Sequence, residues 1–384
     1  MNLEQLVRET FHDLTEDSPQ PAPDFADRVL RVRRRRRIRA LATVAAATAV
    51  AVIVAVAVPG LAHDLADGLT GLPASTLVSH PDQSPPRDLI AAGDTAMSAW
   101  NTKKWVVRSG SGKNATRTLQ YTWHLYNPTT GRYESVPWAY LDVAPGMKTA
   151  AVLEGPLPSK RVGLLDMSTG KVTRWIGLDH PAGGVSWSPK GDKLAVTTYS
   201  GVPETIIGTE VSWVDVFSRT GYYVVDTASG TTAFHALPQG NDDHNTREDL
   251  AWSRDGSLLK LPNMANGDTW YFDLQGERRS TPEGERDVFL APGLSPDGRH
   301  FSDGGQVTDA SNDAVISNPP VQTLRVWADN DWLIGWGCDS TCGNEFHNRL
   351  VLVDIHGKHV TALSGYREGK DSDSGRWNPL FTKR

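Results

Sequence analysis

The sequence predicts an all-β fold made of repeated four-stranded units, placed outside a membrane that the chain crosses once. Three observations predict it: an uncharged apolar run behind a cluster of arginines, a change from helical to strand periodicity after it, and two turn motifs that alternate to the C-terminus. The chain has 384 residues, of which 39% are hydrophobic, which is enough for a sizeable core.

The apolar run is Ala40–Val58, and it contains no charged residue. Nineteen helical residues span roughly 28 Å, close to the thickness of the hydrocarbon core of a bilayer. Arg33–Arg37 and Arg39 precede the run, so the positive-inside rule predicts a cytoplasmic N-terminus and an extracytoplasmic C-terminal part. This position at the membrane edge favours stop-transfer and contact with anionic lipid over nucleic-acid binding, so we expect no nucleic-acid partner.

A cleavable signal peptide is the alternative interpretation of this segment, because Ala55-Val56-Ala57 resembles a small-residue cleavage pattern. The apolar run is longer than the about 7–15 residues of a typical signal peptide. It also follows 39 residues that have a helical pattern of their own. We therefore favour an uncleaved single-pass anchor in the cell membrane. Residues 1–39 carry a net charge of +2, whereas the part after residue 60 carries −8.

Residues 1–39 are predicted to be a short helical cytoplasmic segment. An apolar stripe at helical spacing defines its first helix: Leu3, Leu6, Val7, Phe11 and Leu14. Two interpretations stay open. The segment is either a loosely ordered tail that lies on the lipid headgroups, or a docking segment for a cytosolic protein partner.

Residues 59–94 are predicted to be a proline-containing stalk, and residues 95–384 the β domain. One repeated element is a strand that leads into a Ser-Pro-x-Gly-type turn and a second strand, as in Val185–Val196, Leu250–Leu259 and Gly293–Gly298, with a divergent copy in Val143–Val152. The proline and glycine at the turn supply the fixed and the positive φ that a tight hairpin needs.

The second repeated element is an apolar strand that ends in Asp or Asn, followed by a turn with glycine. It occurs in Tyr121–Gly131, Gly163–Gly170, Tyr222–Gly230, Trp270–Gly276 and Leu350–Gly357. The two elements alternate, and each pair supplies about four antiparallel strands, which is one blade of a β-propeller. Six pairs predict six blades, with five to seven possible; the second element of the fifth blade is hard to find between Asn312 and Trp327.

The C-terminal stretch Ser374–Phe381 resembles another copy of the first element, with no blade after it. We therefore expect it to close the propeller against blade one, near Trp100–Val107. Closure would remove the open edges of a linear array.

These repeats give residues 95–384 a resemblance to the TolB-like and Trp-Asp-repeat-like β-propellers of bacteria. The turns that carry it are Trp187-Ser-Pro-Lys-Gly191, Trp252-Ser-Arg-Asp-Gly256 and Leu294-Ser-Pro-Asp-Gly298. The Gly-His and Trp-Asp dipeptides of eukaryotic repeats are absent. Residues 1–58 resemble the heads of actinobacterial single-pass proteins, some of which are encoded near extracytoplasmic-function sigma factors. That resemblance implies a cytosolic partner such as a sigma factor.

The two cysteines, Cys338 and Cys342, are predicted to form a local disulfide outside the cytoplasm, because their spacing is not that of thioredoxin and no second pair offers a zinc site. Acidic residues gather in Asn241–Asn245 and Glu368–Gly375. The second group imitates a calcium loop, but Thr382 stands where such a loop needs glutamate, so both groups are expected to be solvated loops.

No catalytic, cofactor-binding or metal-binding motif is recognised, and the predicted function is that of a non-enzymatic binding module. A protein or peptide is the expected ligand, and Trp332 and Trp336 are candidates for its surface. The alternative is an extracytoplasmic lyase or hydrolase with acids and histidines at the mouth of the propeller channel.

Overall fold

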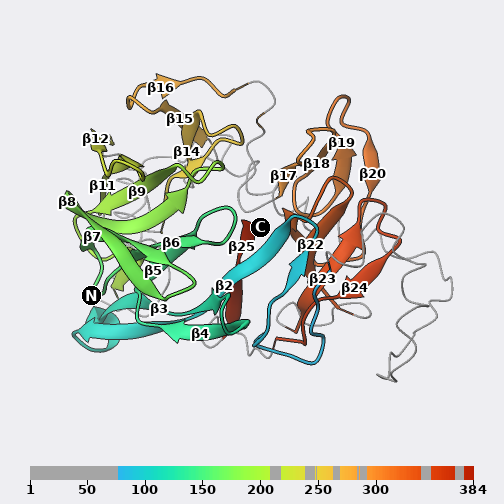
Figure 1. Ribbon diagram of the computed structural model, residues 1–384, viewed down its shortest axis with the longest axis horizontal. Coiled ribbons are helices and arrows are strands. Elements are labelled where there is room, and N and C mark those ends of the chain that lie inside the picture. The colour runs from blue at the N-terminus through green and yellow to red at the C-terminus, as the bar shows by residue number, and fades with distance from the viewer. Residues whose placement is uncertain are drawn as a thin grey trace, which may run out of the picture. The chain divides into compact units, whose positions relative to one another are not determined.

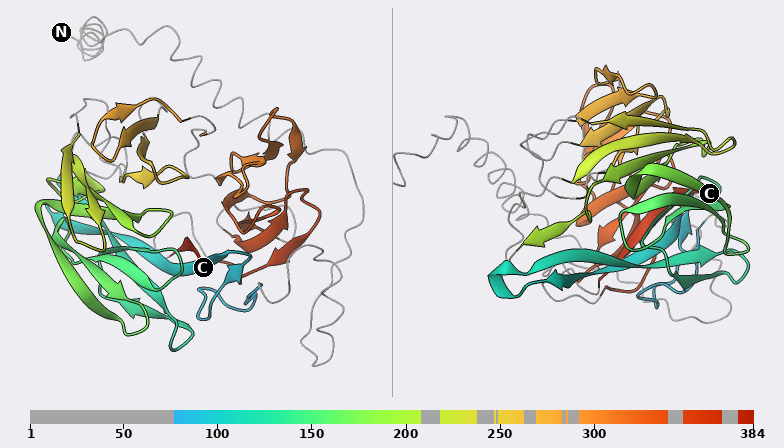
Figure 2. Two further views of the ribbon diagram at one scale, coloured as in Figure 1. Left: turned by 45° about the horizontal axis from the view of Figure 1, so that its top comes forward. Right: turned by 90° about the vertical axis from the view of Figure 1, so that its left-hand side faces the viewer.

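The computed structural model describes residues 77–207, 218–237, 247, 249–262, 269–282, 285, 292–338, 347–367 and 376–384 (Figure 1). Nearly all regular structure within these ranges is β-strand, and the exception is a short 3₁₀ turn at Gly112–Asn114. The predicted all-β class is confirmed. The strands form a propeller-like arrangement of sheets (Figure 2).

The strands pair into five antiparallel sheets. The first contains β1 (Ala91–Ala92), β2 (Thr95–Ser109), β3 (Thr116–Asn127), β4 (Arg132–Val136), β10 (Thr205–Ile207) and β25 (Trp377–Lys383). The second contains β5 (Tyr140–Val143), β6 (Thr149–Leu153), β7 (Ser159–Asp166), β8 (Lys171–Trp187), β9 (Lys193–Tyr199), β11 (Arg219–Asp226) and β12 (Thr232–Ala236).

The other three sheets have four strands each. They are β13 (Ala251–Trp252), β14 (Leu258–Pro262), β15 (Thr269–Asp273) and β16 (Arg278–Arg279); β17 (Gly293–Leu294), β18 (His300–Ser302), β19 (Val307–Asp309) and β20 (Val315–Ser317); and β21 (Thr323–Trp327), β22 (Trp332–Gly337), β23 (Arg349–Asp354) and β24 (Val360–Ala362).

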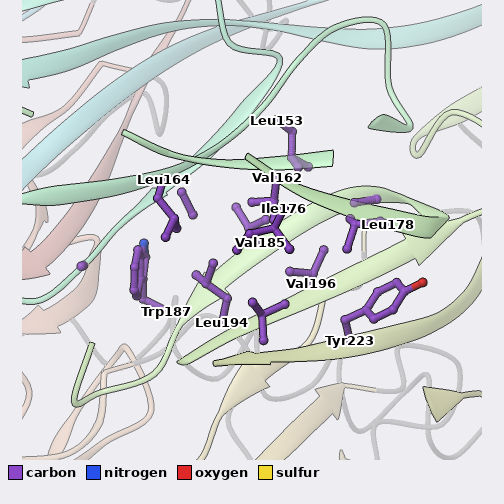
Figure 3. Close-up of a cluster of buried hydrophobic side chains, with 14 residues drawn as sticks. Leu153, Val162, Leu164, Ile176, Leu178, Val185, Trp187, Leu194, Val196 and Tyr223 are labelled. Carbon is purple, nitrogen blue, oxygen red and sulfur yellow. The ribbon is translucent and has the colours of Figure 1, made fainter. Parts of the chain in front are cut away.

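The seven-stranded sheet contains two meanders that share β8. Residues 171–177 of β8 pair with β7, whereas residues 184–187 pair with β9. Side chains from β6 and β7 meet side chains from β9 and β11 in one buried cluster, in which Leu153, Leu164, Leu194 and Tyr223 take part (Figure 3). The number of hydrogen-bonded sheets is therefore five, one fewer than the six blades expected from the repeats.

The C-terminal strand joins the first sheet as the sequence predicts. β25 pairs antiparallel with β2, with Thr95 opposite Lys383 and Thr102 opposite Trp377. The sheet therefore combines the last strand of the chain with strands near residue 100. This closure, which the sequence places near Trp100–Val107, is confirmed.

Each meander has two distinct ends. The turns after its first and third strands lie at one end, which we call the turn end. The connections after its second and fourth strands lie at the other, which we call the connection end. This follows from the alternation of strand direction in an antiparallel meander.

Buried serines stabilise the turns after three of the first strands. Ser188, Ser253 and Ser295 each accept, through Oγ, a hydrogen bond of 2.9–3.0 Å from the backbone N–H five residues later. The glycine three residues after each serine has a φ between 70° and 77°, a conformation that glycine adopts without steric cost. These are the Ser-Pro-x-Gly-type turns that the sequence predicts.

A terminal Asn or Asp stabilises each of the turns after the third strands. Its side-chain oxygen accepts a backbone N–H inside the turn at Asn127, Asp166, Asp226, Asp273, Asp309 and Asp354. The copy at Asp309 is the one that is hard to find in the sequence. Asp313, with φ 61°, occupies the position that glycine holds in the other turns, and the turn precedes the range in which the repeat is expected.

Tryptophans connect neighbouring meanders. The indole Nε1 of Trp187, Trp252 and Trp327 donates a hydrogen bond of 3.0–3.2 Å to a backbone carbonyl of the preceding first strand, at Asp142, Ser186 and Gly293 respectively. All three tryptophans are buried. Trp187 and Trp252 therefore belong to the core between adjacent meanders.

The folded domain begins earlier than the sequence indicates. Val78 pairs with Ala91, and Ile90 is fully buried in a hydrophobic cluster with Trp100. Residues 77–94, assigned from the sequence to the stalk, are therefore part of the β domain. The prolines in this stretch are typical of a linker, but here they lie in a loop that packs against the domain. Trp100 Nε1 donates a hydrogen bond to the carbonyl of Pro86 in this loop.

None of the helical structure in the described ranges is long and apolar enough to cross a membrane. The predicted anchor Ala40–Val58, the cytoplasmic segment 1–39 and residues 59–76 of the predicted stalk lie outside the described residues.

Candidate binding surface

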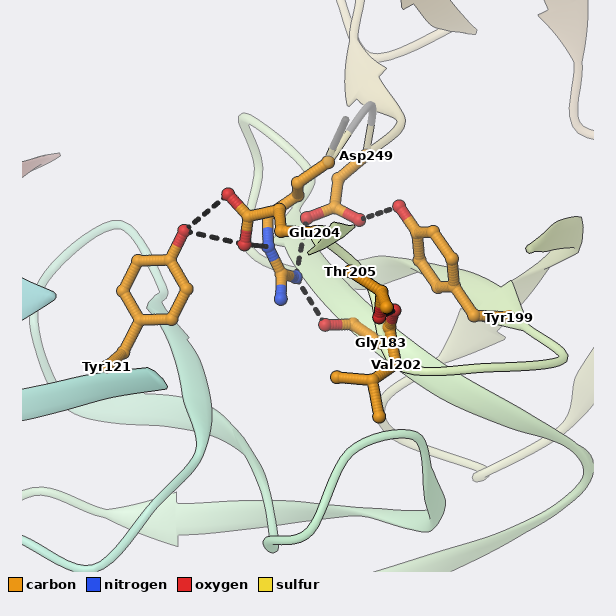
Figure 4. Close-up of polar contacts among 8 residues, drawn as sticks. Tyr121, Gly183, Tyr199, Val202, Glu204, Thr205 and Asp249 are labelled. Carbon is orange, nitrogen blue, oxygen red and sulfur yellow. Dashed lines mark hydrogen bonds and ion pairs between the residues drawn. The ribbon is translucent and has the colours of Figure 1, made fainter. Parts of the chain in front are cut away.

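The connection end holds a largely buried cluster of charged and tyrosine side chains around Arg247, in which the side chains of Arg247, Glu204 and Asp249 are 9%, 17% and 14% exposed (Figure 4). Arg247 precedes β13, in the segment that joins two meanders. Its Nε lies 3.1 Å from Oε2 of Glu204, and its Nη1 lies 3.1 Å from Oδ2 of Asp249. Nη1 also donates a hydrogen bond to the backbone carbonyl of Gly183 on β8. One cation therefore joins three chain segments that are far apart in the sequence.

The two carboxylates of this cluster are fully engaged. The hydroxyl of Tyr121 on β3 shares its one proton between Oε1 and Oε2 of Glu204, which lie 2.8 and 2.9 Å away. The hydroxyl of Tyr199 on β9 donates to Oδ1 of Asp249 at 2.8 Å. Each carboxylate oxygen thus accepts at least one hydrogen bond, which a buried carboxylate requires. We call Arg247, Glu204, Asp249 and the tyrosines around them the Arg247 network.

A third tyrosine lies under the cation. The guanidinium carbon of Arg247 is 4.1 Å from the ring centroid of Tyr140 on β5, a cation–π distance. Burial first, and then the nearby carboxylates, raise the pKa of Tyr121, Tyr140 and Tyr199 well above the ordinary tyrosine value. Burial lowers the pKa of Arg247, but the neighbouring carboxylates outweigh it and hold that pKa well above its ordinary range. The tyrosines therefore remain neutral and the arginine charged.

Two glycines make room for the network. A Cβ on Gly184 would lie 2.1 Å from carboxyl atoms of Asp249, and a Cβ on Gly183 would lie 2.4 Å from the ring of Tyr199. Both distances are far shorter than a van der Waals contact. The Gly183-Gly184 pair in β8 therefore lets the backbone approach the buried ion pairs directly.

A segment from one meander reaches across to the first sheet. Residues 200–207, which we call the bracing segment, leave β9 and end in β10, which pairs with β3 so that Thr205 lies opposite Thr118. The backbone carbonyl of Glu204 accepts a hydrogen bond from Leu119 N at 3.2 Å. Glu204 has φ 56°, a left-handed conformation that costs about 1 kcal/mol for a residue other than glycine. The contacts of the Arg247 network offset that cost.

The bracing segment holds the base of a hairpin that extends beyond its neighbours. β25 pairs with β2 only as far as Thr102, and β4 pairs with β3 only from Trp123 onward. Residues 103–122 therefore project past the flanking strands, with β10 beside residues 116–118 (Figure 2). We call residues 103–122 the projecting hairpin. Tyr121, at its base, donates to Glu204, so the Arg247 network anchors the hairpin.

The structure corrects the expectation that Trp332 and Trp336 form a ligand surface. Their exposed fractions are 3% and 5%, and both belong to a buried cluster. Trp336 packs against Trp377 with ring centroids 5.2 Å apart, and the guanidinium of Arg367 covers its ring at 3.4 Å. Both side chains are buried because β22 is covered on both of its faces, along its whole length.

The remaining candidates from the sequence contribute no site to the described structure. Cys338 is disulfide-bonded, and the other cysteine, Cys342, lies outside the described residues. Asn241–Asn245, Glu368–Gly375 and the apolar stripe of residues 3–14 also lie outside them. Within the described ranges, no group of three or more His, Cys, Asp or Glu side chains is arranged to hold a metal ion.

Sequence reasoning does not find the Arg247 network. Its members come from five segments separated by up to 128 positions, and no repeat or spacing links them. One local indication of the network in the sequence is the charged triplet Arg247-Glu248-Asp249, just before a first strand. The Gly183-Gly184 pair is a second signal, because adjacent glycines inside a strand indicate close approach of another group.

The chain matches no protein-family model, and no curated protein matches it in sequence. Among solved structures it is similar to TolB from Acinetobacter baumannii, with 14% identity, a TM-score of 0.40 and coverage of 83% of this chain and 70% of that one. It is also similar to hydrazine synthase of Kuenenia stuttgartiensis, with 17% identity, a TM-score of 0.33 and coverage of 59% and 65%.

A further similar structure is the Cps50 (Swd1) β-propeller domain of Myceliophteria thermophila, with 14% identity, a TM-score of 0.33 and coverage of 65% of this chain and 68% of that one. The propeller-like arrangement is evident from the strand pairing of the chain.

Proposed function

We propose that this chain is a single-pass membrane protein whose extracytoplasmic, six-bladed propeller is a non-enzymatic binding module for a protein or peptide. The observation that carries the proposal is the Arg247 network. It fixes irregular connections from several blades into one rigid surface at the connection end. Binding residues commonly lie on loops that a rigid scaffold positions.

Two observations support the proposed count of six blades. Six turns capped by Asn or Asp each join a third strand to a fourth, within the described ranges. The long strand β8 pairs with β7 through its first half and with β9 through its second half. We therefore propose that the seven-stranded sheet corresponds to two blades.

The chemistry of the network favours binding over catalysis. A general base needs a carboxylate with a free lone pair directed at substrate. In the Arg247 network, Tyr121 and Tyr199 donate to the carboxylates, and Arg247 neutralises much of their charge. We therefore assign the network to positioning the connections rather than to proton transfer.

Photo-crosslinking of the full chain in its own membrane tests the binding surface. A photoreactive amino acid is placed at Lys104 or Ser111 on the connection end, or at Lys190 or Thr130 on the turn end; all four positions are exposed. We expect one discrete protein adduct from the connection-end positions only. Equal adducts from both ends, or none from the connection end, would contradict the proposal.

The cytoplasmic part of the proposal is that residues 1–39 hold a cytosolic partner such as a sigma factor. Its support is the apolar stripe that contains Leu6 and Phe11. Full-length chain is recovered from membranes, and its cytosolic partners are compared with those of the Leu6→Asp/Phe11→Asp variant. Loss of one partner is expected. An unchanged set of partners would show that docking does not use this stripe.

A further inference from the structure

Exposed apolar side chains are concentrated on the projecting hairpin and the strand beside it. Five large hydrophobic side chains in the described residues are exposed, and three of them lie here: Trp105 (38%) and Val107 (55%) on β2, and Ile207 (55%) on β10. Trp105 lies opposite Leu119, and Val107 opposite Arg117, so both point to one face of the hairpin. Ile207 lies opposite Thr116, on the other face.

The same element is strongly basic within an acidic domain. Residues 95–127 contain five Lys or Arg and no Asp or Glu, whereas residues 62–384 carry a net charge of −8. Within the described structure, Lys104, Arg108, Lys113 and Arg117 form no ion pair; Arg108 donates only to the hydroxyl of Thr118.

The basic side chains are distributed around the whole hairpin. By strand alternation, Arg117 shares the face of Trp105, while Lys104 and Arg108 lie on the opposite face. Lys113 lies in the exposed 3₁₀ turn at the tip. A protein partner that pairs with one face would leave the charges on the other unused. If a planar anionic surface meets the tip of the hairpin end-on, the basic side chains of both faces can contact it.

We propose that the projecting hairpin docks, tip first, on the anionic outer surface of the membrane in which the chain is anchored. Trp105 and Val107 enter the interfacial region, as tryptophan does in membrane proteins, and the basic side chains contact anionic headgroups. Neither contribution needs to be strong alone, because stable membrane attachment commonly combines an apolar and an electrostatic contribution.

The proposal rests on the single-pass anchor of the proposed function, because the anchor supplies proximity. Eighteen residues lie between Val58 and Leu77, where the described domain begins, and the connection spans at most roughly 65 Å. The anchored domain is therefore never far from the bilayer, and docking is an intramolecular step with a high effective concentration. The Arg247 network, through Tyr121 and β10, keeps the hairpin in one orientation.

Full-length chain reconstituted into vesicles provides the test. Ser111, exposed at the tip, is replaced by cysteine and carries an environment-sensitive fluorophore; Lys190→Cys on the turn end is the reference position. In vesicles of phosphatidylcholine with about one-third phosphatidylglycerol, we expect a blue shift and quenching by spin-labelled lipid at position 111 but not at 190. Both signals should weaken in pure phosphatidylcholine and at high salt.

Matched charge reversals separate hairpin docking from a general effect of charge. Lys104→Glu/Lys113→Glu should lower the docked-to-free ratio on the order of a hundredfold. Lys148→Glu/Lys190→Glu, in turns at the other end, makes the same change in net charge and should leave the ratio unchanged. Equal effects of the two pairs would overturn the proposal.

Two further outcomes are decisive. Protease protection in the same vesicles reports whether the anchor inserts; if it does not, the anchor of the proposed function fails. If the anchor inserts but the fluorophore at position 111 shows no blue shift and no quenching, hairpin docking is wrong and the single-pass anchor stands. A label that responds to polyglutamate or to a single-stranded oligonucleotide, but not to anionic lipid, assigns the hairpin to another polyanion and also overturns the proposal.

Discussion

The two ends of the meanders are built on different principles. At the turn end, the serine-stabilised and the Asp- or Asn-capped turns are each stabilised by a residue inside the turn, such as Ser253 or Asp226, and the pattern recurs from meander to meander. At the connection end, Arg247, Glu204 and Gly183 come together from three different connections. Stability is local and repeated at one end, and non-local and unique at the other.

This difference determines how each end responds to change. Substitution of the capping residue of a turn removes only the hydrogen bonds of that cap. The loss in the free energy of unfolding is therefore close to that of one or two hydrogen bonds. A buried cation that joins several segments leaves uncompensated carboxylates when it is removed. The connection end is therefore the end that is more sensitive to substitution, and it is also the end at which we propose the binding surface.

Removing the central arginine should give the largest loss. Arg247→Ala leaves Glu204 and Asp249 buried without their cation, and we expect it to lower the free energy of unfolding by about 3–5 kcal/mol. Arg174→Ala is the matched change at the turn end. Arg174 is exposed and donates to the carbonyls of Ala228 and Ser229, so its loss should cost about 1 kcal/mol.

Urea unfolding of the full chain in detergent, followed by tryptophan fluorescence, measures both variants. Arg247→Lys serves as a second control, because lysine keeps the charge but cannot bridge two carboxylates as a guanidinium does. Its loss should fall between those of the two alanine variants. Similar losses for Arg247→Ala and Arg174→Ala would show that the Arg247 network is no more important than a surface contact.

Glycine substitutions give the next largest difference between the ends. In Gly184→Ala, the new Cβ would lie 2.1 Å from carboxyl atoms of Asp249 and would displace it, at a cost of about 2–3 kcal/mol. In Gly170→Ala, at the turn end, the Cβ meets nothing within 4 Å, and the φ of 66° is the only obstacle. That conformation costs about 1 kcal/mol. Thermal unfolding measures both variants. A larger loss of stability in Gly170→Ala than in Gly184→Ala would contradict the prediction.

Sequence reasoning succeeds at the turn end because the physics there is local. Proline, glycine, serine and aspartate within a few positions determine a turn, so Ser188-Pro-Lys-Gly191 predicts the turn between two strands without knowledge of distant residues. Repetition then supplies the meanders and the closing strand. The turn at Asp309 was difficult because Asp313 takes the left-handed conformation in place of glycine, which a search for glycine overlooks.

Sequence reasoning fails where side chains meet across blades. Nothing near Tyr121 in the sequence indicates that its hydroxyl will reach Glu204, 83 positions later. Trp336 is buried because both faces of β22 are covered by other parts of the domain, which the residues around it in the sequence do not indicate. Both cases depend on packing across the whole domain, which also sets strand register.

The comparison can be sharpened with a carboxylate that lies away from the Arg247 network. Asp142 on β5 accepts hydrogen bonds from the backbone N–H groups of Val143 and Trp187 at 2.9 and 2.7 Å, and no cation pairs with it in the described structure. Burial raises the pKa of Asp142 from 3.8 to about 6, although these two hydrogen bonds lower it. The folded protein therefore disfavours the charged form of Asp142.

The sign of the pH effect follows from that shift. A carboxyl with a higher pKa in the folded than in the unfolded state destabilises the protein at neutral pH, and the destabilisation diminishes as the pH falls through 6. Between pH 7.5 and pH 5, this group should add about 1.4 kcal/mol to the free energy of unfolding. Asp142→Asn cannot ionise, so its unfolding energy should lack this increment over the same range. If both proteins show the same pH dependence from urea titrations at matched ionic strength, Asp142 is charged in the folded protein at pH 5 and its burial does not control its ionisation.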